Sequence, residues 1–338
     1  MKVSFFTIKP WEKEYLENKL RGSKLEIKPE YFKEKLDQDH LPKNKDAEII
    51  SVFVDSEVNK EVIHAFPKLK LIAARSTGYD HIDLKEAAKR KISVTYVPDY
   101  GENTVAEFTF ALILALSRKI LKAHEQIRKT GSFSQENLQG FDLKGRTIGV
   151  VGAGRIGKNT IRIANGFGMN VIAYDVYPEK KLEKLMHFKF VPFKELLKVS
   201  DIVTLHVPYI KATHHLINHD SLKLMKKGAY LINTARGQVV ETEALVKALK
   251  DGHLGGAGLD VLEEENVTCD ELQFVLGGHP EEHNLKTVLA NHVLIDMPNV
   301  VITPHNAFNT KEALQRILDT TLENIQDFIT GAPKNLVK

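Results

Sequence analysis

A glycine motif constrains the fold of this chain more than any other feature. Gly152, Gly154 and Gly157 form the pattern G-x-G-x-x-G directly after an apolar run at residues 147–151. In a strand–turn–helix unit, the first glycine permits a tight turn, the second lets backbone approach a pyrophosphate, and the third lets helix and strand pack closely. The N-terminus of the following helix offers free N–H groups and the positive end of its dipole to the phosphates. The motif therefore predicts a dinucleotide site.

The residues after the glycines support the same interpretation. A second apolar run at residues 171–174 ends on Asp175. A carboxylate at this position accepts hydrogen bonds from both ribose hydroxyls and repels a 2′-phosphate. A purely structural glycine turn is the alternative for an isolated motif, but here strand, helix, second strand and terminal acid follow in the expected order. We therefore predict that the chain binds NAD.

The composition is that of a globular enzyme. Of the 338 residues, 43% are hydrophobic and 27% are charged, and this length suffices for two domains with sizeable cores. The formal net charge is only +3 with both signs interspersed, so we expect no nucleic-acid partner. Cys269 is the single cysteine, which excludes an intrachain disulfide and favours a reducing, cytoplasmic compartment. No apolar stretch approaches the roughly 20 residues of a membrane span, so we expect no membrane partner.

Short apolar runs alternate with helical patterns along the chain, which predicts parallel sheets covered by helices. The first hundred residues hold four or five such runs, at residues 3–8, 25–27, 49–54, 69–74 and 92–97. A second series contains six runs, at residues 147–151, 171–174, 202–207, 229–233, 257–259 and 300–303. Six is the number that a full dinucleotide-binding sheet needs. We therefore predict an α/β fold with two domains, one of them a Rossmann-type sheet.

Two helices lie outside this alternation. Residues 102–119 form a helical segment that is apolar all round, so we expect it to be buried between domains or against another subunit. A last helix is predicted at about residues 311–329, bounded by Gly331 and Pro333. Because it follows the sixth strand of the second series, this helix can return to the first domain.

Polar residues follow three strands of the second series. Arg236, Asp260 with the acids at residues 263–265, and His305 each come directly after one of the apolar runs. Ligands of open parallel sheets bind at the C-terminal ends of the strands, so we expect these side chains to face one crevice. Each residue alone could equally form a salt bridge in a loop, but three of them at this edge favour a catalytic interpretation.

Arginine, carboxylate and histidine beside a nicotinamide form the minimal set for interconverting a 2-keto acid and a 2-hydroxy acid. The guanidinium binds the substrate carboxylate through two parallel hydrogen bonds. The imidazole donates or accepts the hydroxyl proton while hydride moves. A nearby carboxylate fixes the tautomer of the imidazole and favours its protonated form.

At these positions the sequence resembles the D-isomer-specific 2-hydroxyacid dehydrogenases, and within that family the D-lactate dehydrogenase branch. The resemblance covers nearly the whole chain and rests on residues 75–80, Tyr100, and residues 105–107, 152–157, 205–208, 233–237, 258–261 and 303–308. It implies a smaller, flavodoxin-like α/β substrate domain, residues 1–100 and 306–338, hinged to a Rossmann NAD-binding domain, residues 101–305. Family members are usually dimers joined through the helix that matches residues 102–119, so the resemblance also implies a homodimer.

The resemblance further implies roles for individual residues. Arg236 would hold the substrate and polarise its carbonyl, and His305, with Glu265 as its partner, would give the keto oxygen its proton. The implied cofactor contacts are Gly152, Gly154, Arg155, Ile156, Gly157, Asp175, Val207, Pro208, Thr234, Ala235, Arg236 and Asp260. The implied substrate contacts, besides Arg236, are Thr77, Gly78, Tyr100 and Phe308.

Departures from the family pattern leave the substrate open. Tyr100 is followed by Gly101, where lactate-type members commonly have serine, and Asn309 stands where an aromatic residue is frequent. The long stretch at residues 266–298 resembles the lactate branch. We expect a small 2-keto acid, with pyruvate first, and keep branched, aromatic or phosphorylated keto acids as alternatives.

Two other kinds of function are weaker alternatives. An NAD-sensing binding protein, such as the corepressors that share this fold, typically carries long extra segments, and this chain has no low-complexity linker. A metal site could be imagined at His214, His215 and His219, but the glutamate of an H-E-x-x-H motif and further ligands at suitable spacing are missing. We therefore expect no metal.

Overall fold

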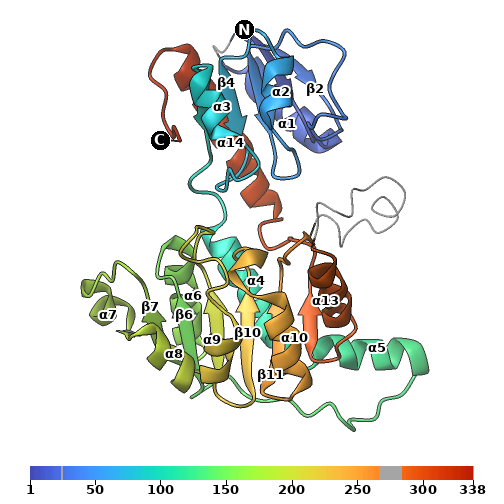
Figure 1. Cartoon of the computed structure of the whole chain (residues 1–338), viewed down its shortest axis with the longest axis vertical. Helices are drawn as coiled ribbons and strands as arrows, with labels where there is room; N and C mark the ends of the chain where they lie inside the picture. The colour runs from blue at the N-terminus through green and yellow to red at the C-terminus, as the bar shows by residue number, and fades with distance from the viewer. Residues whose placement is uncertain (24–25, 266–283, 338) are drawn as a thin grey trace. The chain divides into compact units, whose positions relative to one another are not determined.

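The computed structural model describes residues 1–23, 26–265 and 284–337, so Cys269 and most of the 266–298 stretch lie outside the described residues. The chain divides into two compact units, Met1–Tyr100 with Thr310–Lys338, and Gly101–Asn309. Each unit has its own parallel sheet and its own hydrophobic core (Figure 1). The predicted α/β class with two parallel sheets is therefore confirmed.

The first unit contains a five-stranded parallel sheet in the order β2-β1-β3-β4-β5. The central strands β3 and β4 are buried along their whole length, as parallel strands covered on both faces must be. The strand order is that of a flavodoxin-like sheet. The elements of this unit are β1 Lys2–Phe5, α1 Pro10–Arg21, β2 Lys28–Tyr31, β3 Ile49–Val52, α2 Lys60–Ala65, β4 Leu71–Ala74, α3 Leu84–Lys89, β5 Ser93–Thr95 and α14 Lys311–Ile329.

The C-terminal helix α14 lies in the first unit, among the N-terminal elements (Figure 1). Its N-cap Thr310 accepts a hydrogen bond from the N–H of Ala313, which explains why the helix begins where the sequence predicts. Leu318 and Ile325 on its buried face join the cluster that contains Phe5. The helix therefore completes a core that the first hundred residues begin.

The second strand of this sheet lies later in the sequence than predicted. The apolar residues 25–27 suggested a strand, but β2 runs from Lys28 to Tyr31, and Leu25 lies outside the described residues. As an edge strand, β2 is half-exposed and contains Pro29, so it lacks the apolar pattern of a buried strand. Apolar periodicity therefore locates the central strands better than this one.

The second unit contains a seven-stranded parallel sheet in the order β12-β11-β10-β9-β6-β7-β8. If β6 is counted as strand 1 of this unit and the sheet is read from the β8 edge, the strand order is 3-2-1-4-5-6-7. This is the Rossmann order 3-2-1-4-5-6, with β12 as one further strand at the opposite edge. The predicted number of six was wrong, because β8 has only two residues and no apolar run to reveal it. The strands are β6 Thr147–Val151, β7 Asn170–Tyr174, β8 Lys189–Phe190, β9 Ile202–Leu205, β10 Ala229–Asn233, β11 Leu254–Leu259 and β12 Val300–Ile302.

Helices cover both faces of this sheet. One hydrophobic cluster joins the sheet to α8, α9, α10 and α13, and the other joins it to α4, α6 and α7. Figure 1 shows α8, α9 and α10 side by side with the central strands. The helices are α4 Glu102–Ser117, α5 Ile120–Thr130, α6 Arg155–Gly166, α7 Lys181–Met186, α8 Phe193–Val199, α9 His219–Leu224, the 3₁₀ turn η1 Gly237–Val239, α10 Thr242–Lys250 and α13 Leu285–Ile295.

The apolar helix expected at residues 102–119 is present as α4. Helix α4 packs inside its own unit, against α6 and the sheet, where Phe110 and Ile113 are buried beside Ile148. The helix ends near Lys119, whose left-handed backbone (φ 51°) turns the chain into α5. Burial in the core of its own unit thus accounts for the apolar residues on this face of α4.

Candidate active site

The glycine turn after β6 has the geometry that the motif predicts. Gly152 has φ 94°, and a Cβ there would lie 2.5 Å from the carbonyl oxygen of His206. A Cβ at Gly157 would lie 2.0 Å from the carbonyl oxygen of Gly152, so this close contact of helix and turn requires glycine. Gly154, the N-cap of α6, faces open space instead. The turn therefore leaves room for a phosphate at the N-terminus of a twelve-residue helix.

Asp175 is held over this turn by backbone groups. Its Oδ2 accepts a hydrogen bond of 2.8 Å from Ala153 N–H, and its Oδ1 accepts one of 2.9 Å from Tyr177 N–H. The carboxylate oxygens keep further lone pairs for a ribose. Arg155, exposed, and Ile156, half-buried, begin α6 beside it. The open space at the second glycine and the oriented carboxylate fit the pyrophosphate and ribose of NAD.

The loop after β9 contains His206, followed by Val207 and Pro208. The His206 Nε2 lies 3.1 Å from Oγ1 of Thr204 and 3.2 Å from Oγ1 of Thr160 on α6. Burial lowers the pKa of His206 to about 3, so its ring is neutral at physiological pH. Val207 is half-buried and Pro208 is exposed. The histidine therefore joins the strand to α6, while Val207 packs against the hydrophobic core and Pro208 faces solvent.

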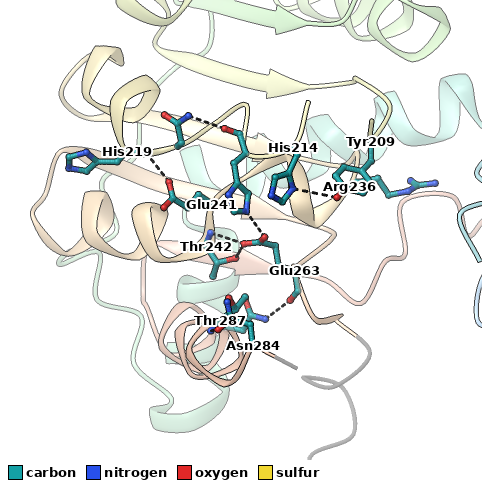
Figure 2. Close-up of polar contacts among 12 residues, drawn as sticks. Tyr209, His214, His219, Arg236, Glu241, Thr242, Glu263, Asn284 and Thr287 are labelled. Atoms are coloured by element: carbon teal, nitrogen blue, oxygen red, sulfur yellow. Dashed lines mark hydrogen bonds and ion pairs between the residues drawn. The ribbon is translucent and has the colours of Figure 1, made fainter. Parts of the chain in front are cut away.

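The turn after β10 holds Thr234, Ala235 and Arg236. Asn233 braces this turn: its Oδ1 accepts from Ala235 N–H at 3.0 Å, and its Nδ2 donates to Arg236 O at 2.9 Å. The Arg236 Nη1 donates to the carbonyl of Ala235 at 2.8 Å. Figure 2 shows the Arg236 side chain extending away from the polar cluster around Glu263. These hydrogen bonds fix the backbone of the turn that carries the half-buried Arg236.

Asp260, after β11, organises the turn that carries His305. It is 1% exposed, and its carboxylate accepts hydrogen bonds from Thr303 Oγ1 at 2.5 Å and from the N–H groups of Asn306 and Ala307, each at 2.8 Å. Burial raises the pKa of Asp260, and these hydrogen bonds oppose that rise. Asp260 therefore holds the loop after β12 on both sides of the histidine.

His305 and Glu265 form a hydrogen-bonded pair. The distance from His305 Nδ1 to Glu265 Oε1 is 2.9 Å, and about a third of each side chain is exposed. His305 has φ 48°, and its N–H donates to the carbonyl of Asp260 at 2.8 Å. Since a carboxylate only accepts, Nδ1 carries a proton, and Nε2 is left to exchange one with a ligand. The Phe308 ring lies edge-on to the imidazole, with 6.3 Å between the centroids.

These residues share one edge of the sheet in the second unit. The glycine turn, Asp175, Val207, Arg236 and Asp260 follow β6, β7, β9, β10 and β11, and His305 follows β12. Because all seven strands are parallel, their C-terminal ends meet at the same edge, on both sides of the switch point between β6 and β9. The fold therefore gathers the predicted cofactor and catalytic residues there.

The remaining predicted substrate residues lie in the first unit. Thr77 and Gly78 form a loop after β4, in which Thr77 Oγ1 donates to Val97 O at 2.8 Å and Ser76 Oγ donates to Gly78 O at 2.6 Å. The carbonyl of Tyr100 accepts a hydrogen bond of 2.7 Å from Nε of Arg316 on α14. Thr77 and Gly78 thus follow the C-terminal end of β4, and Tyr100 is bonded to α14.

The three consecutive acids after Asp260 differ in their contacts. Glu265 pairs with His305, whereas Glu263 accepts hydrogen bonds from His215 Nε2 at 2.7 Å and from Thr242 (Figure 2). The sequence resemblance named Glu265 as the partner of His305 and gave no role to Glu263, His215 or Thr242. Nothing local in the sequence connects Glu263 with His215 and Thr242, because His215 and Glu263 lie on two different loops and Thr242 begins α10.

The histidines considered for a metal have other partners. The rings of His214 and His215 stack with centroids 3.9 Å apart, and His214 Nδ1 lies 3.4 Å from the Tyr209 hydroxyl. Within residues 1–23, 26–265 and 284–337, no group of three or more histidine, cysteine or acidic side chains could hold a metal ion. In the same described residues, no helix is long and apolar enough to cross a membrane.

Comparison with known proteins decides the family. Residues 110–307 match the family described as "D-isomer specific 2-hydroxyacid dehydrogenase, NAD binding domain". The chain belongs to this family. It is 39% identical to a 2-hydroxyacid dehydrogenase homolog of Zymomonas mobilis over 98% of both chains. A glyoxylate reductase of Korarchaeum cryptofilum is 38% identical over 87% of this chain and 83% of its own.

A solved structure gives the same result for the fold. The D-lactate dehydrogenase of Aquifex aeolicus, crystallised with NAD and lactic acid, superimposes with a TM-score of 0.84 at 36% identity, over 98% of this chain and 96% of its own. The predicted family and cofactor are therefore confirmed. The chain is an NAD-dependent dehydrogenase of 2-hydroxy acids.

Proposed function

We propose that this dehydrogenase reduces a small 2-keto acid, pyruvate first, to the D-2-hydroxy acid. The observation that carries this proposal is the 2.9 Å pair of His305 and Glu265 at the edge of the NAD-binding sheet. An imidazole with one nitrogen directed at a carboxylate has its other nitrogen free to exchange a proton. The likeness to a D-lactate dehydrogenase that was crystallised with lactic acid supports pyruvate and lactate as the substrate pair.

His305 is the proposed acid and base of the reaction. Bound NADH supplies the hydride to the keto carbon, and the keto oxygen then needs one proton. In reduction His305 gives that proton from Nε2, while Glu265 accepts the Nδ1 hydrogen bond and stabilises the charged ring before transfer. In oxidation the neutral ring takes the proton back. Reduction therefore requires protonated His305, and oxidation requires the neutral form.

Arg236 is the proposed substrate clamp. Its planar guanidinium can form two parallel hydrogen bonds to a carboxylate, and its charge polarises the adjacent carbonyl. The braced turn below it, with Asn233 bonded on both sides of Ala235, fixes where the side chain starts. We assign the first unit to substrate binding as well, through the backbone at Thr77 and Gly78 and through Tyr100, with Phe308 contributed by the second unit.

Two alternatives stay open. The same chemistry could act on glyoxylate or on a branched, aromatic or phosphorylated keto acid, and the 38% identity to a glyoxylate reductase supports the first of these. An NAD-sensing binding protein is the alternative of another class. The hydrogen-bonded pair of His305 and Glu265 supports catalysis, because sensing alone needs no proton donor at this edge.

A panel of 2-keto acids tests the proposal. NADH oxidation would be followed with pyruvate, glyoxylate, 2-ketoisocaproate, phenylpyruvate and a phosphorylated keto acid, each also with NADPH. We expect the highest kcat/KM with pyruvate, D-lactate as the product, and at least a tenfold preference for NADH, about 1.4 kcal/mol, because Asp175 repels a 2′-phosphate. Turnover of another keto acid above pyruvate would replace the substrate, and NADH binding without any turnover would favour the sensor.

We further propose a cytoplasmic homodimer. The single cysteine supports a reducing compartment. Helix α5 exposes Ile120, Leu121 and Ile127, with 51%, 55% and 43% of their surfaces accessible, and Phe133 follows with 83%. An apolar face of this kind on a helix without buried residues fits a subunit contact. Light scattering should give about twice the mass of one chain, and a Leu121→Glu variant should give the mass of one.

A further inference from the structure

A single carboxylate, that of Glu263, connects the loops that follow three neighbouring strands. Its Oε1 lies 2.7 Å from Nε2 of His215, in the segment between β9 and α9. Its Oε2 accepts hydrogen bonds from the N–H of Thr242 at 2.9 Å and from its hydroxyl at 2.7 Å, at the first turn of α10. Figure 2 shows these contacts converging on Glu263.

The backbone of the same residue is also bound. The carbonyl of Glu263 accepts a hydrogen bond of 2.7 Å from Nδ2 of Asn291, a residue of α13 that is 0% exposed. The Glu263 side chain is only 13% exposed, so its bonds are shielded from water and from competing salt. Four hydrogen bonds from three elements therefore fix this position of the loop after β11.

Backbone packing ties the same loop to the turn that carries Arg236. A Cβ at Gly237 would lie 2.0 Å from the carbonyl carbon of Leu262 and 2.3 Å from the N of Glu263. The loop thus rests directly on the residue after Arg236. Only two residues further on, Glu265 Oε2 accepts from Leu262 N–H at 3.3 Å, while its Oε1 reaches His305.

We propose that Glu263 is a positioning residue that acts through Glu265, by fixing the loop that aims the Glu265 carboxylate at Nδ1 of His305. This inference rests on the proposed function of His305 as the proton donor. Within the described residues, Glu265 has one hydrogen bond besides that to the histidine, of 3.3 Å from Leu262 N–H, and a third of its side chain is exposed. The orientation of the Glu265 carboxylate therefore depends on Glu263, which is fixed by its own hydrogen bonds two positions earlier in the loop.

Glu241 offers a matched control for Glu263. It too is an acid bonded near the start of α9: its Oε2 accepts from the N–H of His219, the first residue of that helix, at 3.2 Å (Figure 2). It lies next to Thr242 in the sequence but belongs to the loop after β10, and it is not part of the loop that carries Glu265. Glu241→Ala therefore removes a comparable contact without loosening the Glu265 loop.

Kinetics give the first test. Glu263→Ala should lower kcat for keto-acid reduction about tenfold while the Kd for NADH changes less than twofold. Glu263→Gln keeps the length of the side chain and an oxygen for Thr242 N–H, so it should recover most of the activity. Glu241→Ala should stay within twofold of the wild type in both quantities. Thr242→Val removes one hydrogen bond to Glu263 at nearly constant side-chain volume, so its kcat should lie between those of Glu263→Ala and the wild type. Thr242→Ser keeps the hydroxyl and should have a kcat near that of the wild type. If Glu263→Ala does not fold, Thr242→Val serves as the test in its place.

A double-mutant cycle separates positioning from general damage. If Glu263 acts through Glu265, then Glu263→Ala should cost less than twofold in kcat once Glu265 is already glutamine. Equal costs in both backgrounds would show an independent structural role and overturn the proposal. So would a Glu263→Ala enzyme with wild-type kcat.

The ring signals of His305 give a readout that needs no activity. In ¹H–¹³C NMR at fixed pH, with the signal assigned by its loss in His305→Gln, Glu265→Gln should shift the His305 ring resonance. Glu263→Ala should shift it in the same direction by at least half as much, and Glu241→Ala should not. If the wild type reduces no keto acid and these shifts still occur, the proposed function is wrong and the positioning role stands. If the enzyme is active and Glu263→Ala leaves the resonance in place, the positioning role is wrong.

Discussion

The glycine turn after β6 and the polar loops after β10, β11 and β12 lie at the same edge of one sheet, yet they are built in opposite ways. The turn consists of backbone: Gly152 and Gly157 leave no room for a Cβ, and Gly154 faces open space. The loops consist of side chains, in which Asp260, Glu263 and Glu265 each bind residues from another part of the chain. The first arrangement suits a ligand common to many enzymes, and the second suits one reaction.

The difference also concerns charge. The turn offers N–H groups and a helix dipole, which do not titrate and need no side chain. The loops hold acids and a histidine that can exchange protons, and their positions depend on hydrogen bonds over 20 to 50 residues of sequence, as from His215 to Glu263. Cofactor binding should therefore survive changes in the loops, and catalysis should not.

Removal of the histidine should separate the two regions most strongly. His305→Ala removes the proposed proton donor, and general acid–base groups contribute roughly 10²–10⁴ in rate, so we expect kcat to fall by about 10³ in both directions. The glycine turn is untouched, and the Kd for NADH should change less than twofold. Stopped-flow kinetics and fluorescence titration with NADH measure the two quantities. A comparable loss of NADH affinity would contradict the division into two regions.

Exchange of the arginine should have the next largest effect. Arg236→Lys keeps the positive charge but loses the planar fork, so we expect kcat/KM for the keto acid to fall by roughly 10², about 2.7 kcal/mol. NADH binding should again be nearly unchanged, since the pyrophosphate site is the turn after β6. Steady-state kinetics with the preferred keto acid check this. Near-normal activity in the lysine variant would place the carboxylate clamp at another residue.

A substitution in the turn should show the opposite pattern. Gly157→Ala places a Cβ 2.0 Å from the carbonyl oxygen of Gly152, so the helix must shift away from the strand. We expect about a tenfold weaker Kd for NADH and a loss of about 1–3 kcal/mol in the free energy of unfolding. Gly154→Ala is the control: its methyl meets open space, so it should weaken NADH binding and leave stability unchanged. Equal stability of the two variants would show that the turn is not strictly packed.

The same contrast explains what the sequence could predict. The glycine turn and Asp175 lie within 24 residues and have local causes, a positive φ at Gly152 and a close contact at Gly157, so the motif alone indicated them. The strand ends that carry Arg236 and His305 followed from apolar runs. Buried runs predicted the central strands, and Gly331 and Pro333 marked the end of α14.

What was missed depends on tertiary contacts. The apolar pattern of α4 was clear, but only the fold shows that it packs on α6 and the sheet of its own unit. The strand β8 has two residues and is held by pairing with β7. The family resemblance named Glu265, but the bond of Glu263 joins it to His215, 48 residues away, so no local pattern could reveal it.

The smallest expected effect concerns His206, in the loop after β9, the strand that lies between β6 and β10. His206 bonds Thr160 on α6, and burial lowers its pKa to about 3, against about 6.5 in the unfolded chain. Below pH 6.5 the unfolded state therefore binds a proton that the folded state refuses, so stability is lost as pH falls from about 6.5 toward 3. At pH 5 the loss should be about 1–2 kcal/mol, and at pH 7 there should be almost none.

His206→Gln tests this, because glutamine keeps a polar side chain near Thr160 and does not titrate. Other groups also titrate as the pH falls. Burial raises the pKa of Asp260. The pKa of Asp201 is lowered, because its hydrogen bonds from Lys226 and from Thr147 N–H outweigh the opposing effect of burial. They are present in both proteins, so the difference between the two curves of unfolding free energy against pH isolates His206. We expect the wild type to lose stability faster than the variant between pH 6.5 and 4. Parallel curves would mean that the ring is protonated in the folded protein, and that His206 belongs with the titrating residues of the loops.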